Sequence, residues 1–189
     1  LSGMLVGGAA AITAMTIWLR RGGYFSHVRE SDLHDLGKLM FGLATLWAYM
    51  WFSQYMLIWY SNIPEETTYF IRREEGGWAF LFWANLVLGW AVPFVLLLPR
   101  PAKQSEMNLL WSAGFLLGGR WLDVYLMAAP ATQPVHLGIG IVDLAVVLAF
   151  SSGLILVSAA ALKRAPAQTS NDPYFVETLQ NAPSGVHLN

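Results

Sequence analysis

The feature that most constrains this chain is a series of uninterrupted apolar runs, each long enough to cross a lipid bilayer. A hydrocarbon core about 30 Å thick takes about 20 helical residues, whereas a membrane barrel would show alternating strands of about ten residues. Only 12% of the residues are charged, about half the share usual in soluble domains. We therefore expect an all-α integral membrane protein with about five transmembrane helices, at residues 2–19, 36–62, 77–98, 106–128 and 137–162.

Local sequence signals mark several helix boundaries. Ser31, followed by Asp32 and Asp35, is typical of an N-terminal cap with acidic residues near the positive end of the helix dipole. Pro64 predicts the end of that same helix, because proline disfavours helical geometry in the residue before it. Pro93 lies inside the third run and predicts a kink there.

The distribution of positive charge predicts the orientation in the membrane. Eight basic residues fall on one side of the expected spans, and only Arg72 and Arg73 fall on the other, beside Glu74 and Glu75. An excess of Lys and Arg marks the cytoplasmic side. We therefore expect residues 1–162 to form the transmembrane bundle, and the polar tail 163–189 to be cytoplasmic. The eight residues are Arg20, Arg21, Arg29, Lys38, Arg100, Lys103, Lys163 and Arg164.

Composition also excludes several classes of function. The formal net charge of −1, with only 11 Lys and Arg, leaves no basic surface for nucleic acid. The absence of cysteine excludes iron–sulfur ligation, zinc–thiolate sites and covalent attachment of haem c. No group of residues resembles a catalytic triad, a phosphate-binding loop or a metal site, so we expect no catalytic residue and no bound metal.

Charged residues inside a membrane are costly, so they are functional candidates by default. Arg120 and Asp123 lie three residues apart in the fourth run, and Asp143 lies about six residues into the fifth. Counting along the helices places Gln54 and Asn85 at the same depth, in the outer third of the membrane. One interpretation is an ion pair that locks the fourth helix to the fifth. The other is a proton path in which Arg120 holds a carboxylate and an aspartate exchanges the proton; Asp143 is the better candidate for that aspartate, because Asp123 has Arg120 as a local partner.

One histidine extends the second interpretation. His136 lies at the outer entrance of the fifth run, and a side chain with an ordinary pKa near 6.5 can pass protons between outer water and Asp143. A surface position without function is the competing interpretation. Two facing membrane histidines, which a b-type haem would need, are not expected in this chain.

The densest aromatic run lies between Trp47 and Tyr60. Helix packing explains such a run by itself. A second interpretation is the wall of a flat, apolar ring ligand such as a quinone, since small-molecule pockets are mostly apolar with a few placed polar groups. The candidates for that wall are Gln54, Tyr55, Asn85 and Trp59. Pro64-Glu65-Glu66 follows on the outer surface, as a solvated turn or a contact with an extramembrane subunit.

The same run carries a resemblance to a known family. Together with Ser61-Asn62-Ile63-Pro64-Glu65-Glu66-Thr67, it resembles the signature of ActF, the NrfD-like (polysulfide reductase NrfD) membrane subunit of alternative complex III. Gly119-Arg-Trp-Leu-Asp-Val-Tyr-Leu-Met127 and Asp172-Pro-Tyr-Phe-Val-Glu-Thr-Leu179 agree with it. Members of this family have about twice as many helices, so the chain resembles a C-terminal half: four helices of the NrfD-like bundle plus a C-terminal helix.

The resemblance implies a multi-pass subunit in a bacterial inner membrane, within a menaquinol:cytochrome c (or other acceptor) oxidoreductase. It implies a contribution to proton translocation, and whether the chain is itself enzymatic stays open. Menaquinone is the expected ligand, with haem c and iron–sulfur clusters in partner subunits. Those partners are the NrfD-like sister subunit ActC, multihaem cytochromes c, an iron–sulfur subunit and a terminal oxidase. The alternatives are a purely structural anchor for such subunits, or the membrane subunit of a polysulfide or molybdopterin reductase.

Overall fold

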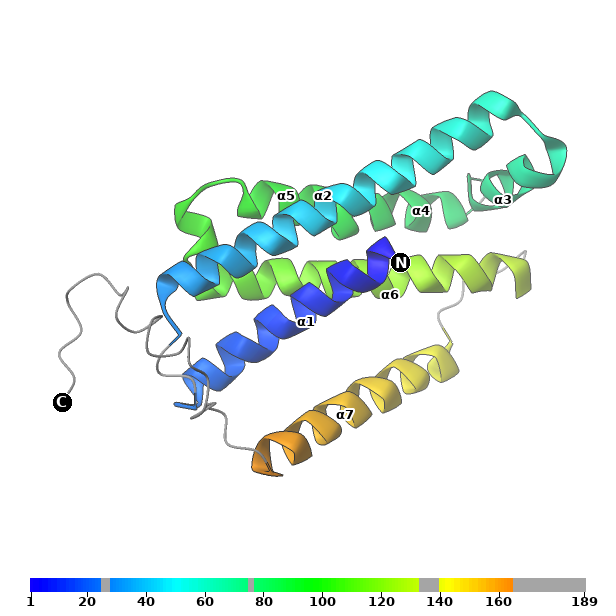
Figure 1. The fold of residues 1–189 in the computed structure, drawn as a ribbon. Coiled ribbons are helices and arrows are strands. Elements are labelled where there is room, and N and C mark those ends of the chain that lie inside the picture. Colours follow the sequence, from blue (N-terminus) through cyan, green and yellow to red (C-terminus); the bar gives the residue numbers. More distant parts are fainter. Residues whose placement is uncertain (25–27, 75–76, 133–139, 165–189) are drawn as a thin grey trace, which may run out of the picture. The chain divides into compact units, whose positions relative to one another are not determined.

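A computed structural model describes residues 1–24, 28–74, 77–132 and 140–164 of the chain, and these form an all-helical protein (Figure 1). The expected all-α class is confirmed, with no strand among the described residues. The chain divides into two compact units, Leu1–Gly138 and Ile139–Asn189. His136 lies outside the described residues, and so does the tail after Arg164. The helices of the first unit are α1 (Ser2–Arg21), α2 (Glu30–Ser61), α3 (Pro64–Glu74), α4 (Trp78–Leu86), α5 (Val92–Leu97) and α6 (Glu106–Thr132), and the second contains α7 (Ile141–Arg164).

Three stretches of helix are long and apolar enough to cross a membrane, and they indicate a membrane protein. They are Ser2–Arg21, Trp78–Leu97 and Ile141–Leu162. The remaining two expected spans are also helical and longer than a bilayer requires, with 32 residues in α2 and 27 in α6. The many Trp and Tyr residues of α2 and the charged pair in α6 make these two helices less apolar.

The core of the first unit lies where α1, α2 and α6 pack against one another. On α1, the buried residues Val6, Ala10, Thr13 and Ile17 recur at helical spacing and form one face. Thr13 satisfies its own hydroxyl by donating to the carbonyl of Ala9 at 2.8 Å. Because this face is built from small and branched side chains, α1 packs closely against α6.

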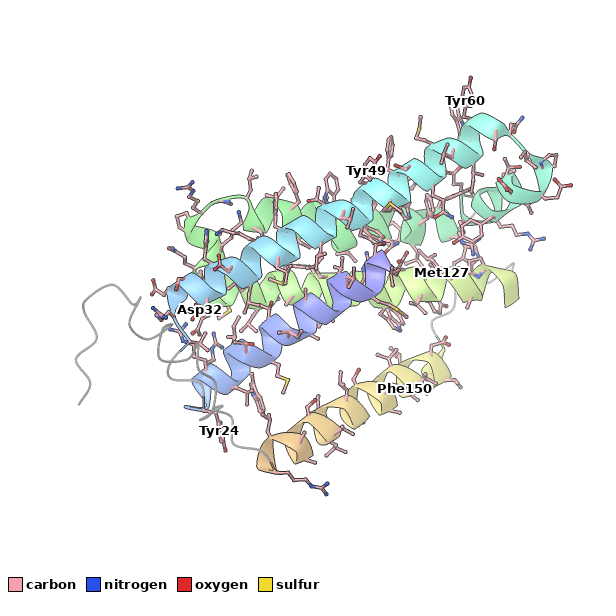
Figure 2. The ribbon with its side chains drawn as sticks, viewed as in Figure 1. Tyr24, Asp32, Tyr49, Tyr60, Met127 and Phe150 are labelled. Carbon is pink, nitrogen blue, oxygen red and sulfur yellow. The ribbon has the colours of Figure 1, made fainter. Side chains whose placement is uncertain are left out.

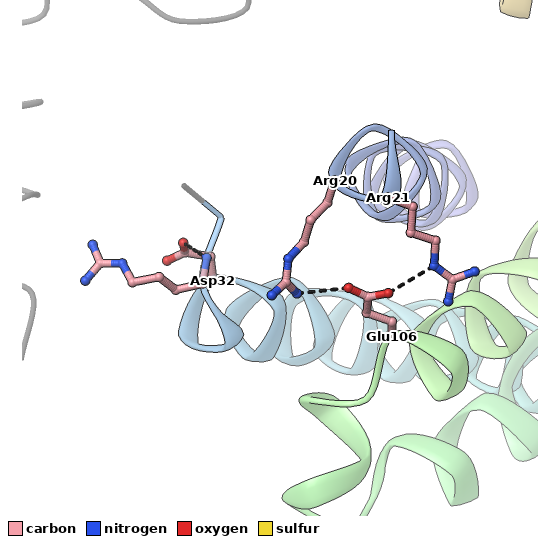
Figure 3. Close-up of polar contacts among 5 residues, drawn as sticks. Arg20, Arg21, Asp32 and Glu106 are labelled. Atoms are coloured by element: carbon pink, nitrogen blue, oxygen red, sulfur yellow. Dashed lines mark hydrogen bonds and ion pairs between the residues drawn. The ribbon is translucent and has the colours of Figure 1, made fainter. Parts of the chain in front are cut away.

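The C-terminal end of α1 is tied to the N-terminal end of α6 by charge (Figure 3). Glu106 accepts from Arg20 Nη1 through Oε1 and from Arg21 Nε through Oε2, each at 3.0 Å. The signs suit both helix dipoles, since an acid lies in the first turn of α6 and two cations lie in the last turn of α1. These half-exposed pairs fix the register of the two helices more than they add stability.

The N-terminal end of α2 differs from the sequence prediction, whereas its C-terminal end agrees with it. Ser31 is not the cap, because α2 begins at Glu30 and the capping residue is Arg29. The Asp32 carboxylate accepts from the Arg29 backbone amide at 2.9 Å, so the acid expected near the dipole performs the capping. At the other end the prediction is confirmed: α2 ends at Ser61, and Asn62 adopts the left-handed conformation with φ of 48° before Pro64.

The third span contains an irregular turn close to Pro93. A π-helical turn, Val87–Ala91, joins α4 to α5, and the amide of Val92 donates to the carbonyl of Val87. Pro93 has no amide hydrogen for the carbonyl of Gly89, four residues earlier, and it lies in the first turn of α5. The predicted irregularity is therefore present, but it takes the form of a widened turn before the proline.

Candidate functional site

The centre of the first unit contains a polar cluster made by α4 and α6. Arg120 Nη1 contacts Asp123 Oδ2 at 3.2 Å, and Asn85 Nδ2 donates to Asp123 Oδ1 at 3.0 Å. Asn85 and Arg120 are buried, with exposed fractions of 2% and 8%. The structure therefore brings together three of the polar residues that the sequence places at one depth, and both oxygens of Asp123 accept a hydrogen bond.

A tryptophan of α2 completes the surroundings of Arg120. The guanidinium lies over the ring of Trp47, 3.5 Å from its centroid, in the geometry of a cation–π interaction. Trp47 is itself buried, with an exposed fraction of 4%. Because Trp47, Asn85 and Arg120 come from α2, α4 and α6, one buried cation links three helices.

Two glycines make room for this cation. A Cβ atom on Gly89 would overlap Arg120 Nη2, and a Cβ atom on Gly119 would lie 2.6 Å from Gly89 Cα and 2.8 Å from Gly89 N. The backbones of α6 and the π-helical turn are therefore in direct contact. Gly3 and Gly7 of α1 also face Arg120, with Cβ positions 3.4 Å from Nη1 and 3.6 Å from Cγ. Larger side chains at these positions would push against the guanidinium.

The polar cluster retains hydrogen-bonding capacity that no protein group meets. Arg120 Nε and Nη2 and Asn85 Oδ1 are buried and have no hydrogen-bond partner in the protein. Buried polar groups are nearly always paired with protein or ordered water. The two residues that contact the Asp123 carboxylate thus offer two donors and an acceptor to a bound water.

Asp143 and Gln54 do not lie where the sequence count places them. Asp143 is in the first turn of α7, not six residues into it, and its Oδ2 accepts from the amide of Gly140 at 2.9 Å. It therefore caps its own helix. Gln54 is exposed and lies about two turns beyond Trp47, the residue of α2 that reaches Arg120. Counting residues back from Asn62 misplaces Gln54, because α2 continues beyond the level of the polar cluster.

The aromatic run has two faces. Tyr49 and Tyr60 point away from the bundle (Figure 2), with exposed fractions of 65% and 86%. Trp51 and Tyr55 stack with their ring centroids 5.9 Å apart and an interplanar angle of 2°, and Phe82 of α4 packs on Trp51 at 5.2 Å. This inner face confirms helix packing as one role of the run.

A cleft of about 380 Å³ lies between the end of α2 and α3. Tyr55 lines this cleft and donates from its hydroxyl to Glu74 Oε1 at 2.8 Å. Two of the four expected quinone-facing residues, Tyr55 and Trp59, line this cleft, whereas Gln54 and Asn85 do not. The lining residues are Tyr55, Ile58, Trp59, Asn62, Thr67, Phe70, Ile71 and Glu74.

Arg73 is a buried residue that the sequence analysis treats as a surface charge. Its exposed fraction is 4%, and its guanidinium donates to the carbonyls of Leu126 at 2.8 Å, Met127 at 3.2 Å and Tyr69 at 2.6 Å. The Leu126 carbonyl lacks its usual helical donor, because that residue is Pro130. Burial lowers the pKa of Arg73 from its ordinary value, and the three carbonyl oxygens stabilise the cation.

The sequence does contain a signal for α3, the helix that carries Arg73. Pro64 at the first helical position, Glu65 and Glu66 in the first turn, and Arg72 and Arg73 in the last form the charge order that suits a helix dipole. Because α3 is polar in composition, it does not stand out beside the long apolar runs of the sequence. Glu74 ends the same helix and accepts a hydrogen bond from the Tyr55 hydroxyl.

Comparison with known proteins finds no protein-family model that matches this chain, and no curated protein that matches it significantly. The described residues contain no group of three or more His, Asp or Glu side chains that could hold a metal ion. The chemistry that the described site offers is accordingly that of a buried cation, a carboxylate and an amide enclosed by helices.

Proposed function

We propose that this chain is an ActF-like, NrfD-type membrane subunit of a menaquinol-oxidising complex of the alternative complex III kind, and that it contributes a proton path to that complex. The observation that carries the proposal is the buried Arg120–Asp123–Asn85 cluster. Charged residues inside a helical bundle are costly and mark ion or proton pathways. The sequence resemblance in the Trp47–Tyr60 run and around Arg120 supports the choice of family.

Within this proposal Asp123 is the group that receives and passes on the proton. Its two oxygens face different partners, Arg120 at 3.2 Å and Asn85 at 3.0 Å. A proton on either oxygen weakens one contact and leaves the other in place, so the carboxylate can change state without losing its position. The unpaired Arg120 Nη2 and Asn85 Oδ1 then offer a water molecule a donor and an acceptor beside the carboxylate.

The proposal keeps the expected topology, with five spans, a bacterial cytoplasmic membrane and a cytoplasmic C-terminus. His136 and Asp143 remain candidates for the outer end of the path. Menaquinol is oxidised by the complex, whose partner subunits supply haem c and iron–sulfur clusters. The four residues expected to face a quinone belong to different surroundings, and this argues against one quinone site made by all of them.

A purely structural anchor is the second candidate. The favouring observation is that Arg120 joins α2, α4 and α6 through Trp47, Asp123 and two glycines. A buried pair of this kind can serve only to fix the arrangement of helices. The membrane subunit of a polysulfide or molybdopterin reductase is a related alternative, because it shares the NrfD-like arrangement.

Asp123→Asn in the complete complex separates these candidates. Asparagine keeps the size of the side chain and an oxygen toward Arg120, but it cannot carry the proton. We expect the rate of menaquinol oxidation and of the proton release coupled to it to fall at least tenfold, while the haem content of the purified complex is unchanged. The matched control is Asp35→Asn, which changes an exposed acid at the start of α2.

The outcomes are distinct. Loss of assembled complex, or normal proton release, would support the anchor instead. Purification of the unmodified, tagged protein tests membership separately: c-type haem and iron–sulfur proteins should accompany it, and their absence would refute the complex itself.

A further inference from the structure

The cleft between α2 and α3 is rich in hydrogen-bond acceptors. Among the described residues that line the cleft, Glu74 is the only charged one, and an ionised carboxylate accepts but does not donate. The Tyr55 hydroxyl already donates to Glu74 at 2.8 Å, and Thr67 donates to the carbonyl of Ile63 at 3.1 Å. Both hydroxyls have already donated their hydrogen, so they can only accept a further hydrogen bond. The cleft therefore favours a ligand with several hydrogen-bond donors.

The other lining residues are the amide Asn62 and four apolar or aromatic side chains, Ile58, Trp59, Phe70 and Ile71. On α3, the lining positions Thr67, Phe70, Ile71 and Glu74 recur at helical spacing and form one face. Trp59 of α2 also lines the cleft and is 66% exposed, so part of its ring is available to a ligand. Aromatic faces attract cations, most strongly when the ring is tryptophan.

The cleft has a fixed shape because α3 is held at both ends of its length. Pro64 and the left-handed Asn62 set the turn out of α2. Near the other end, Arg73 anchors α3 to the carbonyls of Leu126 and Met127 on α6. Glu74 follows Arg73 directly, so the anchored arginine also positions the carboxylate at the end of the cleft.

We propose that this cleft binds the primary ammonium headgroup of a membrane phospholipid, of which phosphatidylethanolamine is the simplest example. A primary ammonium brings three donors and a positive charge, which match Glu74, the Tyr55 oxygen and the Trp59 ring. The cleft follows the apolar part of α2, where Trp and Tyr are enriched at a membrane–water boundary. Ile58, Phe70 and Ile71 contact the methylene groups of the lipid. The inference does not rest on the proton path.

The test is lipid binding by the complete protein, stripped of lipid in detergent and followed by native mass spectrometry. Phosphatidylethanolamine and phosphatidylglycerol with identical acyl chains are added in turn. We expect phosphatidylethanolamine to bind at least tenfold more tightly, because only its headgroup carries the cation. Glu74→Gln keeps an acceptor for Tyr55 but removes the charge, and should weaken that binding about tenfold, the effect of losing one charge-assisted hydrogen bond.

Two further variants keep the test decisive. Glu66→Gln is the matched control, because Glu66 is an exposed acid in the first turn of the same helix and does not line the cleft; its binding should be unchanged. Trp59→Leu alters an exposed side chain and should weaken binding even if Glu74→Gln fails to fold.

Equal binding of the two lipids, or unchanged binding in both cleft variants, would overturn the proposal. Binding of the hydroquinone menadiol that depends on Glu74 and resists phosphatidylethanolamine would assign the cleft to a hydroquinone instead.

Discussion

The contact between Gly119 and Gly89 gives the sharpest prediction, through the substitution Gly119→Ala. The added methyl group would lie 2.6 Å from Gly89 Cα and 2.8 Å from Gly89 N, whereas carbon atoms pack best about 3.5–4.0 Å apart. Because both obstacles are backbone atoms, no side chain can turn away. The π-helical turn and α6 must separate by about 1 Å, the difference between the observed and optimal spacing.

The neighbouring glycine supplies an internal control. A Cβ atom on Gly118 meets nothing within 4 Å, so Gly118→Ala adds a methyl group to the same helix in open space. Both substitutions gain the same helix propensity, about 0.5–1 kcal/mol, and their difference isolates the overpacking. We expect Gly119→Ala to have a free energy of unfolding about 1–3 kcal/mol lower than Gly118→Ala.

Reversible unfolding in mixed detergent and SDS measures this difference. The helical signal in circular dichroism and the fluorescence of the nine tryptophans should report the same transition if it is two-state. Equal stability of the two alanine variants would refute the close approach of α6 and the π-helical turn. A Gly119→Ala variant that is the more stable of the two would refute it more strongly.

Two further predictions concern single side chains. Arg73→Leu should lower the free energy of unfolding by about 2–4 kcal/mol, since it leaves the Leu126 carbonyl without a donor, and adding Pro130→Ala should restore part of the loss by returning a backbone amide. SDS unfolding of the unmodified chain, the two single variants and the double variant checks additivity, with Arg72→Leu as the exposed control. Asp143→Ala should lower the stability of the first turn of α7 by about 1 kcal/mol, whereas Asp143→Asn should retain the cap; helicity and thermal unfolding measure the difference. Equal loss of proton release in both variants would show that the carboxyl group has a role besides capping.

Three apolar helices long enough to cross a membrane were predictable from the sequence, because long apolar runs leave the backbone few choices in lipid. The boundaries of α1 and of the Trp78–Leu97 stretch agree with the expected 2–19 and 77–98 within about two residues. The pairing of Arg120 with Asp123 was also predictable, since residues three apart share a helix face. These features depend on composition and on local spacing alone.

The partners of that pair were not predictable in the same way. Residue counting gives a depth along each helix axis, but it gives neither the rotation of a helix nor its tilt against a neighbour. Trp47 rather than Gln54 therefore meets Arg120, although both belong to α2. The burial of Arg73 is not predictable for a related reason, because it depends on the carbonyl of Leu126, which Pro130 leaves free and which lies more than 50 residues away.

The widened turn, the glycine contact and the buried arginine are best understood as a single arrangement. A guanidinium enclosed by three helices needs space that ordinary helix packing does not leave. The π-helical turn carries Gly89 to the surface of α6, and the absence of side chains on Gly89 and Gly119 leaves that space beside Nη2. π-helical turns within α-helices are frequent at functional sites. If Arg120 served packing alone, an apolar side chain with ordinary helical turns around it would fill the same volume without desolvating a charge. The cost of the arrangement therefore supports the proposed proton path over a role in packing alone.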